Sequence, residues 1–250
     1  MPDSGLSVVI PTRDRCVVLE KCLGALEAQD DSAGIFEVVV VVDGACDATG
    51  EMLAAFPPKR FRLEVISGPP RGPAAARNEG VRRARGTRVL LLGDDTFPSP
   101  GTLGVHARFG AEEIGVQGPI EWDESVGVTR VMRFLAPEGP QFYFRGLTDG
   151  GPMEYWRASA SNLSVPRRWL LEEPFDEGFP DAAFEDTEAA RRWARRGWPL
   201  GWGARAVCRH HHRYESIGPF LARQRRAGRA ARYAVRKDPG LAWRAVVEPV

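Results

Sequence analysis

Runs of apolar residues alternate with segments of helical periodicity through the first hundred residues. Residues 38–42 are continuously apolar, as expected of a strand that is covered on both faces. Residues 17–28 instead place Leu19, Leu23 and Leu26 at helical spacing. Repetition of this pattern predicts strands at 6–10, 36–42, 61–66 and 88–92, and helices at 17–28, 48–56 and 73–84. The alternation with short loops indicates the α/β class, with a doubly wound, mostly parallel sheet flanked by helices.

The alternation fades after residue 100. We expect a strand at 115–120 and a strand or extended segment at 158–165. Residues 121–152 are rich in glycine, aromatic and polar residues, which fits either a mobile connection or an irregular sheet. Two further helices are expected, at 181–196 and, strongly basic, at 219–236. Since there is no internal repeat and no low-complexity linker, the pattern favours one compact domain with a tail.

The composition is that of an ordinary soluble globular protein, with 43% hydrophobic and 27% charged residues in a chain of 250. It excludes disordered, collagen-like and coiled-coil proteins. The apolar runs are far shorter than the roughly 20 residues that span a bilayer, and residues 1–4 do not resemble the start of a signal peptide. The four cysteines form no CxxC pair. We therefore expect reduced thiols in a cytoplasmic protein.

The chain as a whole has nearly equal numbers of basic and acidic residues, but they are unevenly distributed along the sequence. The formal net charge of +1 gives the whole molecule no reason to bind polyanions. Basic residues gather without acids in the last helix: Arg223, Arg225, Arg226, Arg229, Arg232, Arg236 and Lys237. This helix is either a solvated helix packed on the domain, or is weakly attracted to an anionic membrane surface by about 1 kcal/mol per basic residue. No RNA-binding motif accompanies it, so we expect no nucleic-acid partner.

The carboxyl ends of the predicted parallel strands are where ligands bind in open α/β sheets. Asp94 and Asp95 follow the fourth strand directly. Two adjacent carboxylates at the end of a buried strand repel each other and lose hydration, and a divalent cation resolves both costs. The other interpretation is that they begin a turn. A GxGxxG sequence is missing after the first strand, which argues against a classical dehydrogenase.

Two further clusters contain candidate site residues. Glu185 and Asp186 lie near the start of the helix expected at 181–196, where the helix dipole alone would favour acids. The tract 208–212 reads CRHHH, which is not a zinc-finger spacing. Because side chains alternate along a strand, at most His210 and His212 of this tract would share a ligand. A single histidine there could donate to a metal or a phosphate.

Six motifs in the expected order resemble family 2 glycosyltransferases, the inverting sugar transferases of GT-A fold. They are SVVIPTRDR at 7–15, VVVVDGACDAT at 39–49, GPAAARNEG at 72–80, LLLGDDTFPSP at 90–100, SNLSVPR at 161–167, and FDE with a following ED, R and G between 175 and 197. The resemblance covers about residues 6–215. It implies a GT-A domain over 1–215, with 1–100 as the nucleotide-sugar half and 101–215 as the acceptor half. Residues 216–250 would form the basic tail packed on that domain.

The resemblance also implies roles in donor binding. Pro11, Thr12 and Arg13 would line the pocket of the nucleotide base. Asp43 would hydrogen-bond the edge of the base, and Arg77 would lie near the base or the diphosphate. The donor would be a nucleoside-diphosphate sugar, with UDP favoured over GDP or dTDP.

Metal binding and catalysis follow from the same resemblance. Asp95, and less directly Asp94, would hold Mn²⁺ or Mg²⁺ against the donor diphosphate, with His210 or His212 completing the site. Asp186 would be the general base that takes the proton of an acceptor hydroxyl in a single in-line displacement. The acceptor would be a glycan, a lipid-linked molecule or a small molecule. The enzyme would be cytoplasmic, or peripheral at the inner face of the membrane if its basic helix contacts lipid; its oligomeric state is left open.

The chain departs from the family pattern in two places. Val42 stands where many relatives have a second aspartate, which leaves the identity of the base open, and Gly93 replaces the first acid of the metal motif. Two other functions compete with sugar transfer. A nucleotidyltransferase on a similar sheet would need a glycine-rich loop beside Arg13 and Arg15, which is missing. A non-catalytic relative that binds glycans would not need the acids that this chain retains.

Overall fold

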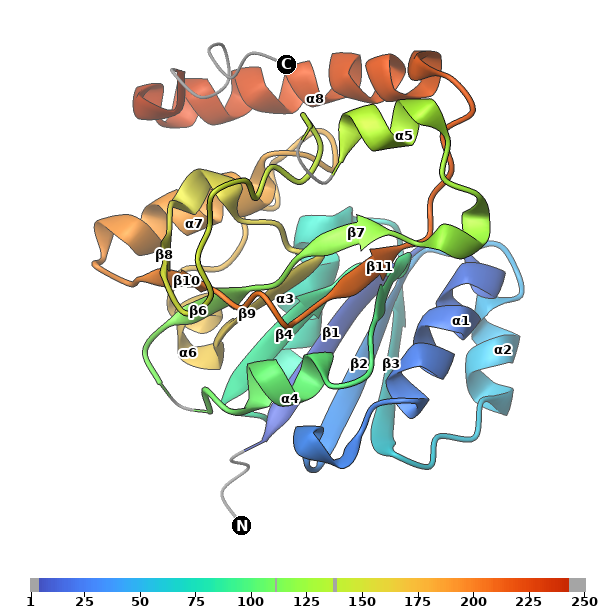
Figure 1. The fold of residues 1–250 in the computed structure, drawn as a ribbon. Coiled ribbons are helices and arrows are strands. Elements are labelled where there is room, and N and C mark those ends of the chain that lie inside the picture. The colour runs from blue at the N-terminus through green and yellow to red at the C-terminus, as the bar shows by residue number, and fades with distance from the viewer. Residues whose placement is uncertain (1–4, 111, 137–138, 243–250) are drawn as a thin grey trace.

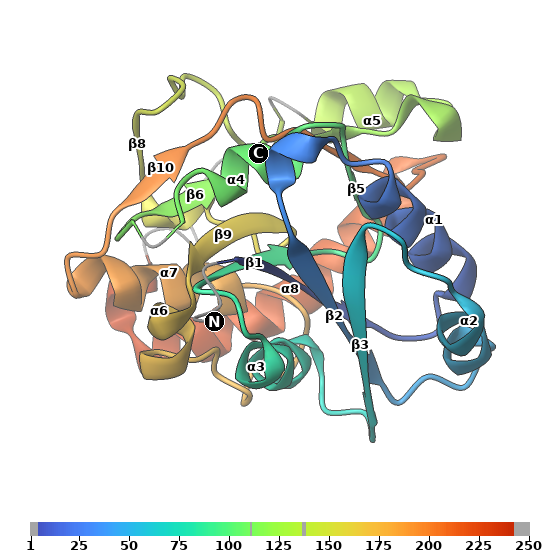
Figure 2. The same cartoon turned by 90° about the horizontal axis from the view of Figure 1, so that it is seen from below.

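The computed structural model describes residues 5–110, 112–136 and 139–242. Its centre is an eight-stranded sheet in the order β3-β2-β1-β4-β9-β6-β10-β8 (Figures 1 and 2). Four strands of the N-terminal half are mutually parallel: β1 (Leu6–Thr12), β2 (Phe36–Asp43), β3 (Phe61–Gly68) and β4 (Arg88–Leu92). The predicted α/β class with a mostly parallel sheet is confirmed. The predictions made on residues 1–4 and on the end of the tail, 243–250, lie outside the described residues.

The second half of the sheet begins with a strand that runs against its neighbours. β9 (Asn162–Pro166) lies antiparallel between β4 and β6 (Gly115–Gln117). β10 (Leu200–Trp202) is parallel to β6, and the edge strand β8 (Pro152–Met153) is antiparallel to β10. The segment expected at 158–165 is therefore a strand that starts at Asn162, deep inside the sheet.

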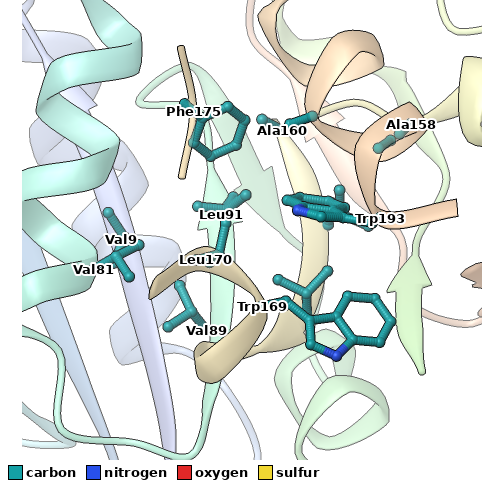
Figure 3. Close-up of a cluster of buried hydrophobic side chains, with 14 of the residues drawn as sticks. Val9, Val81, Val89, Leu91, Ala158, Ala160, Trp169, Leu170, Phe175 and Trp193 are labelled. Carbon is teal, nitrogen blue, oxygen red and sulfur yellow. The ribbon is translucent and has the colours of Figure 1, made fainter. Parts of the chain in front are cut away.

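Helices cover both faces of the sheet because successive side chains of its buried strands point to opposite sides. Val8 and Val38 pack with α1 (Cys16–Glu27) and α2 (Thr49–Ala55) on one face. The other face packs against α3 (Pro73–Arg83), α6 (Arg167–Glu172) and α7 (Glu185–Arg195). Figure 3 shows the centre of that second core, where Trp169 and Trp193 lie beside Leu91. Both faces are mainly apolar, although His106 hydrogen-bonds to the buried Asn162 and Ser164 of β9.

A second sheet of three strands crosses the carboxyl-terminal side of the first. It contains β5 (Thr96–Pro98), β11 (Cys208–His210) and β7 (Ile120–Trp122), in that order. The single strand predicted at 115–120 is wrong. The chain leaves the main sheet after Gln117 and enters the small sheet at Ile120, and Pro119 between them has no N–H to continue a ladder.

Two helices differ from their predicted bounds. α7 begins at Glu185, four residues later than expected, because Phe184 before it has a left-handed backbone with φ of 66°. The basic helix α8 spans Ile217–Lys237. It lies above the sheet, over α5 (Arg130–Leu135) and the end of α7 (Figure 1). The described part of segment 121–152 therefore holds the end of β7, a short 3₁₀ helix, the helix α5 and the start of β8, joined by irregular chain.

The remaining elements are α4 (Thr102–Ala107) and short 3₁₀ helices at Asp31–Ala33, Glu124–Val126, Tyr155–Arg157 and Pro239–Leu241. Within the described residues, no helix has both the length and the hydropathy that crossing a bilayer requires.

Candidate active site

Asp94 and Asp95 follow the end of β4, next to the end of β1. The Thr12 hydroxyl donates to Asp94 Oδ2 at 2.8 Å. Arg15 bridges the two acids: its Nη1 lies 2.8 Å from Asp94 Oδ1, and its Nη2 lies 2.9 Å from Asp95 Oδ2. One guanidinium thus offsets the repulsion between two adjacent carboxylates.

The two acids have opposite pKa shifts. Burial raises the pKa of Asp94 to about 6, although Arg15 opposes this shift. Burial acts in the same direction on Asp95, but the hydrogen bond and charge of His210, together with Arg15, outweigh it and lower that pKa well below its usual range. Asp95 is thus the acid that stays ionised at acidic and neutral pH. It is also the one with more access to solvent, with 16% of its side chain exposed against 7% for Asp94.

Gly93 precedes the two acids, and its surroundings make a side chain difficult there. A Cβ on Gly93 would lie 2.8 Å from Thr96 Oγ1 and 3.2 Å from Asp95 Oδ1. Any larger residue would have to displace one of these groups. This stretch of the chain therefore offers two adjacent carboxylates, those of Asp94 and Asp95.

The histidine tract supplies groups on two sides, as its alternation predicts. His210 Nε2 lies 3.4 Å from Asp95 Oδ2, and the His210 and His212 rings stack with centroids 5.6 Å apart. His211 points elsewhere, with its Nδ1 2.6 Å from Asp123 Oδ2. The Nδ1 atom of His210 is buried and has no hydrogen-bond partner within the described residues.

A pocket of about 320 Å³ lies in front of Asp95. It is lined by His210 of β11, by residues of the loops around the strand ends, by the loop before α7 and by α8: Arg15, Asp95, Phe142, Ser161, Asp181, Ala182, Ala183, His210, His212, Tyr214, Arg223, Arg226 and Ala227. The helix α8 therefore covers the pocket, which explains why residues far apart in the sequence meet there.

The second acidic pair begins α7. Glu185 is buried and accepts a hydrogen bond of 2.8 Å from Arg77 Nη1. Asp186 accepts hydrogen bonds from two backbone N–H groups, those of Ala160 at 3.2 Å and Thr187 at 2.8 Å. Burial, and next the charge of Glu185, raise the pKa of Asp186 to about 6. Asp186 as a whole residue is only partly buried, unlike Glu185 beside it.

One loop connects the two acidic pairs. Ala160, which donates to Asp186, is adjacent to Ser161, whose carbonyl accepts from the N–H of Gly93 at 3.4 Å. Ser161 also lines the pocket in front of Asp95. The loop at residues 159–161 therefore contacts Asp186 and also lines the pocket in front of Asp95, whereas Asp186 itself is not among the residues that line that pocket.

The predicted donor-binding residues are spread more widely. Asp43 accepts from the backbone N–H groups of Arg71 at 2.6 Å and Gly72 at 2.9 Å, and so holds the loop that leads into α3. Arg77 is buried against Glu185. Arg13 is exposed and lies 3.6 Å from Asp14, and Pro11 is a partly covered residue of β1. The contacts expected between these four residues and a nucleotide remain predictions from the sequence.

The sequence prediction missed three arginines of this site. Arg15 lies within the motif at 7–15, but the resemblance implies a donor-binding role for Arg13, two residues earlier. The position of Arg15 one residue before α1 turns its side chain toward both aspartates. Arg223 and Arg226 reach the pocket only through the fold, and no local pattern distinguishes them from the other arginines of α8.

The residues at the pocket fit a divalent metal in part. Within residues 5–110, 112–136 and 139–242, no three His, Cys, Asp or Glu side chains are arranged to hold a metal ion. The carboxylate of Asp95 nevertheless suits Mn²⁺ or Mg²⁺, whereas the imidazoles of His210 and His212 are ligands that softer metals prefer. Sites that bind a metal together with substrate phosphates need only one or two protein ligands, since phosphate oxygens and water supply the rest.

Known proteins that resemble the chain are glycosyltransferases. Glycosyltransferase AglE of Haloferax volcanii is 31% identical over 132 residues, which are 52% of this chain and 43% of that protein. Validoxylamine A glucosyltransferase of Streptomyces hygroscopicus subsp. jinggangensis is 35% identical over 97 residues, 38% of this chain and 23% of that protein. The chain thus spans less than half the length of these two relatives.

Two solved structures share the fold at low identity. The mannosyltransferase PcManGT from Pyrobaculum calidifontis, in complex with GDP-Man and Mn²⁺, has a TM-score of 0.66 and 19% identity over 94% of this chain and 66% of that one. S. aureus TarS 1-349, in complex with UDP-GlcNAc, has a TM-score of 0.62 and 19% identity over 91% of this chain and 66% of that one. The predicted GT-A fold is confirmed by this likeness. The model of the family described as Glycosyl transferase family 2 matches residues 7–145, and the chain belongs to that family.

Proposed function

We propose that the protein transfers a sugar from a nucleoside-diphosphate sugar to an acceptor hydroxyl, with inversion at the anomeric carbon. The observation that supports this most strongly is that one loop, at residues 159–161, both donates a hydrogen bond to Asp186 and lines the pocket that contains Asp95. An in-line displacement needs a group that holds the leaving diphosphate on one side of the reacting carbon. It also needs a base for the incoming hydroxyl on the other side.

Asp186 is the proposed base. Two backbone N–H groups hold its carboxylate, and within the described residues neither of its oxygens is in an ion pair with a cation. A pKa raised to about 6 keeps it ionised at neutral pH while making it more basic than an ordinary aspartate. Such a carboxylate, within hydrogen-bond reach of the acceptor hydroxyl, takes its proton as the bond to the sugar forms, a contribution of about 10²–10⁴-fold.

Asp95 is the proposed ligand of Mn²⁺ or Mg²⁺, with His210 or His212 as the second protein donor. When bound, the metal would neutralise charge that develops on the departing diphosphate. Arg15 would support the same task by its charge, because it lines the pocket and its guanidinium holds Asp94 and Asp95 in place. Asp94, which is held by Thr12 and Arg15, would keep this arrangement in place.

The donor is proposed as a UDP-sugar, with GDP- and dTDP-sugars as the alternatives to be compared. The structural neighbours named above were solved with GDP-Man and with UDP-GlcNAc. The direct experiment measures release of the nucleoside diphosphate from UDP-, GDP- and dTDP-sugars, with and without Mn²⁺. Metal-dependent release from one donor, lost in Asp186→Asn, is the expected result. Release from none of the three would contradict the proposal.

The acceptor is proposed as a hydroxyl of a glycan, a lipid-linked molecule or a small molecule, and a panel of the three classes with the active donor distinguishes them. Weak contact between the exposed basic face of α8 and anionic lipid also stays a prediction. Cosedimentation with vesicles with and without phosphatidylserine tests it, and binding that does not depend on the anionic lipid would contradict it.

A further inference from the structure

Two arginines of α8 point toward the same pocket as Asp95. Arg223 and Arg226 both line it, and they share one side of the helix because residues three apart are neighbours there. Within the described residues, neither has a hydrogen bond or an ion pair with another side chain. Two guanidinium groups in one pocket repel each other, so an anion between them would be stabilised.

The other charged groups of the pocket already have partners. Arg15 is paired with Asp94 and Asp95. Asp181 accepts two hydrogen bonds from Arg229 of α8, at 2.9 and 2.7 Å. No acid of the pocket is therefore left to neutralise the two arginines, and the pocket presents excess positive charge.

The helix that presents these arginines is fixed on both sides of them. On the N-terminal side, Phe220 is buried and packs edge-on against Tyr214, with ring centroids 6.1 Å apart. On the C-terminal side, Ala230 is fully buried and the Tyr233 hydroxyl donates to Asp176 at 3.0 Å. The arginines between these contacts belong to a held helix rather than a free tail. Less conformational freedom is lost when such groups bind a ligand.

We infer that Arg223 and Arg226 form a diphosphate subsite for the sugar donor, on the α8 side of the pocket and opposite Asp95. This inference rests on the proposed function. Guanidinium groups bind phosphate oxygens through paired, charge-assisted hydrogen bonds, which suits a diphosphate. The pocket also contains Asp95, His210 and His212, the proposed metal donors, so a phosphate here would be one that the metal also contacts. That condition favours the diphosphate of the donor over a phosphate of the acceptor.

The same helix offers a matched control. Arg225 and Arg232 are exposed, as Arg223 and Arg226 are, but they do not line the pocket and lie about half a turn around the helix from its buried alanines. Replacing them removes the same charge from the same helix without changing the pocket. Any difference between the two pairs of variants is therefore due to position rather than to net charge.

Isothermal titration with UDP in the presence of Mn²⁺ tests the inference on the full chain. We expect R223Q and R226Q each to weaken UDP binding by about 10-fold and the double variant by about 100-fold. R225Q/R232Q should bind UDP as the wild type does. Affinity for inorganic pyrophosphate should fall in parallel in R223Q/R226Q, whereas affinity for uridine, which has no phosphate, should not change. R223K/R226K should recover part of the loss, since charge is kept but paired hydrogen bonding is not.

UDP affinity of R223Q/R226Q within about twofold of the wild type would overturn the inference. If that variant keeps its UDP affinity but uses a polyprenyl-phosphate acceptor less well, the arginines serve the acceptor phosphate, which also overturns it. Failure of the wild type to bind UDP, GDP or dTDP with Mn²⁺ is a different result. It would contradict the proposed function itself, and the subsite with it.

Discussion

The two acidic pairs of the candidate site, Asp94 with Asp95 and Glu185 with Asp186, are alike in sequence and differ in their partners. In the first pair, one arginine bridges Asp94 and Asp95. In the second pair, the arginine contacts Glu185 alone, and Asp186 is held by backbone N–H groups. Each pair nevertheless contains one acid with a pKa raised to about 6.

This difference separates binding from proton transfer. A carboxylate that already shares a cation, as Asp95 does, is suited to bind further charge such as a metal and its phosphates. A carboxylate without a cation, as Asp186 is, keeps a lone pair that can take a proton. The sequence of a pair, two consecutive acids, does not decide between these tasks, whereas the position of the nearest arginine does.

The largest expected effect comes from removing the base. Asp186→Asn should lower turnover by about 10³-fold while donor affinity stays within about twofold, because the amide cannot take the proton. The raised pKa means that the ionised side chain costs folding free energy at neutral pH, so the same variant should be more stable by about 1 to 2 kcal/mol. Steady-state kinetics and urea unfolding measure the two effects. Turnover close to that of the wild type would assign the base elsewhere.

The next effect contrasts the arginines. Arg77→Gln would leave Glu185 buried without its cation, and we expect it to lower the free energy of unfolding by about 3 kcal/mol. Arg15→Gln should cost less, about 1 kcal/mol, because the Arg15 side chain is 36% exposed against 11% for Arg77. The double variant Arg77→Gln/Glu185→Gln should recover part of the loss. If the two arginine variants lowered the free energy of unfolding equally, the two acidic pairs would not differ in how strongly they depend on their arginine.

The Mn²⁺-dependent part of UDP binding should depend strongly on Asp95 and hardly on Asp186. Asp95→Asn should weaken UDP binding in the presence of Mn²⁺ by at least about 10-fold and leave metal-free binding almost unchanged. Asp186→Asn is the matched control, since it removes one charge from the other pair. Calorimetry with and without Mn²⁺ measures both variants. Equal losses in the two would show that the carboxylates do not have separate tasks.

The smallest effect is on pH dependence. Because the pKa of Asp186 is raised to about 6, the ionised fraction falls as pH decreases through that value. We expect kcat/KM to fall about twofold between pH 7 and pH 6 and about tenfold per pH unit below pH 5. Stability changes in the opposite direction, since protonation removes the cost of the buried charge. A rate that is constant down to pH 5 would be inconsistent with Asp186 as the base.

The sequence predicted the N-terminal half closely, because its strands are buried on both faces. A continuous apolar run such as 38–42 leaves little choice of structure, and glycine and proline at 68–72 mark the loop before α3. The acids at the strand ends were found for the same reason, since charges stand out at the end of an apolar run. Family motifs supplied the roles that local chemistry left open.

The rest could not be predicted from local patterns. β7 and β11 are each three residues long and stabilised by each other, although 88 positions separate Ile120 from Cys208. The short helix α5 is too brief to show a helical period. The contribution of α8 depends on tertiary packing that turns Arg223 and Arg226, but not Arg225, toward the pocket. These features depend on contacts between residues far apart in the sequence, for which the local sequence contains no signal.

The most direct test of the central claim is a crystal structure of the protein with Mn²⁺ and a UDP-sugar. The account predicts anomalous scattering from manganese beside Asp95, the diphosphate between that metal and α8, and the anomeric carbon turned toward Asp186. A nucleotide bound with its diphosphate away from Asp95, or with the sugar on the far side from Asp186, would contradict the division of labour between the two acidic pairs.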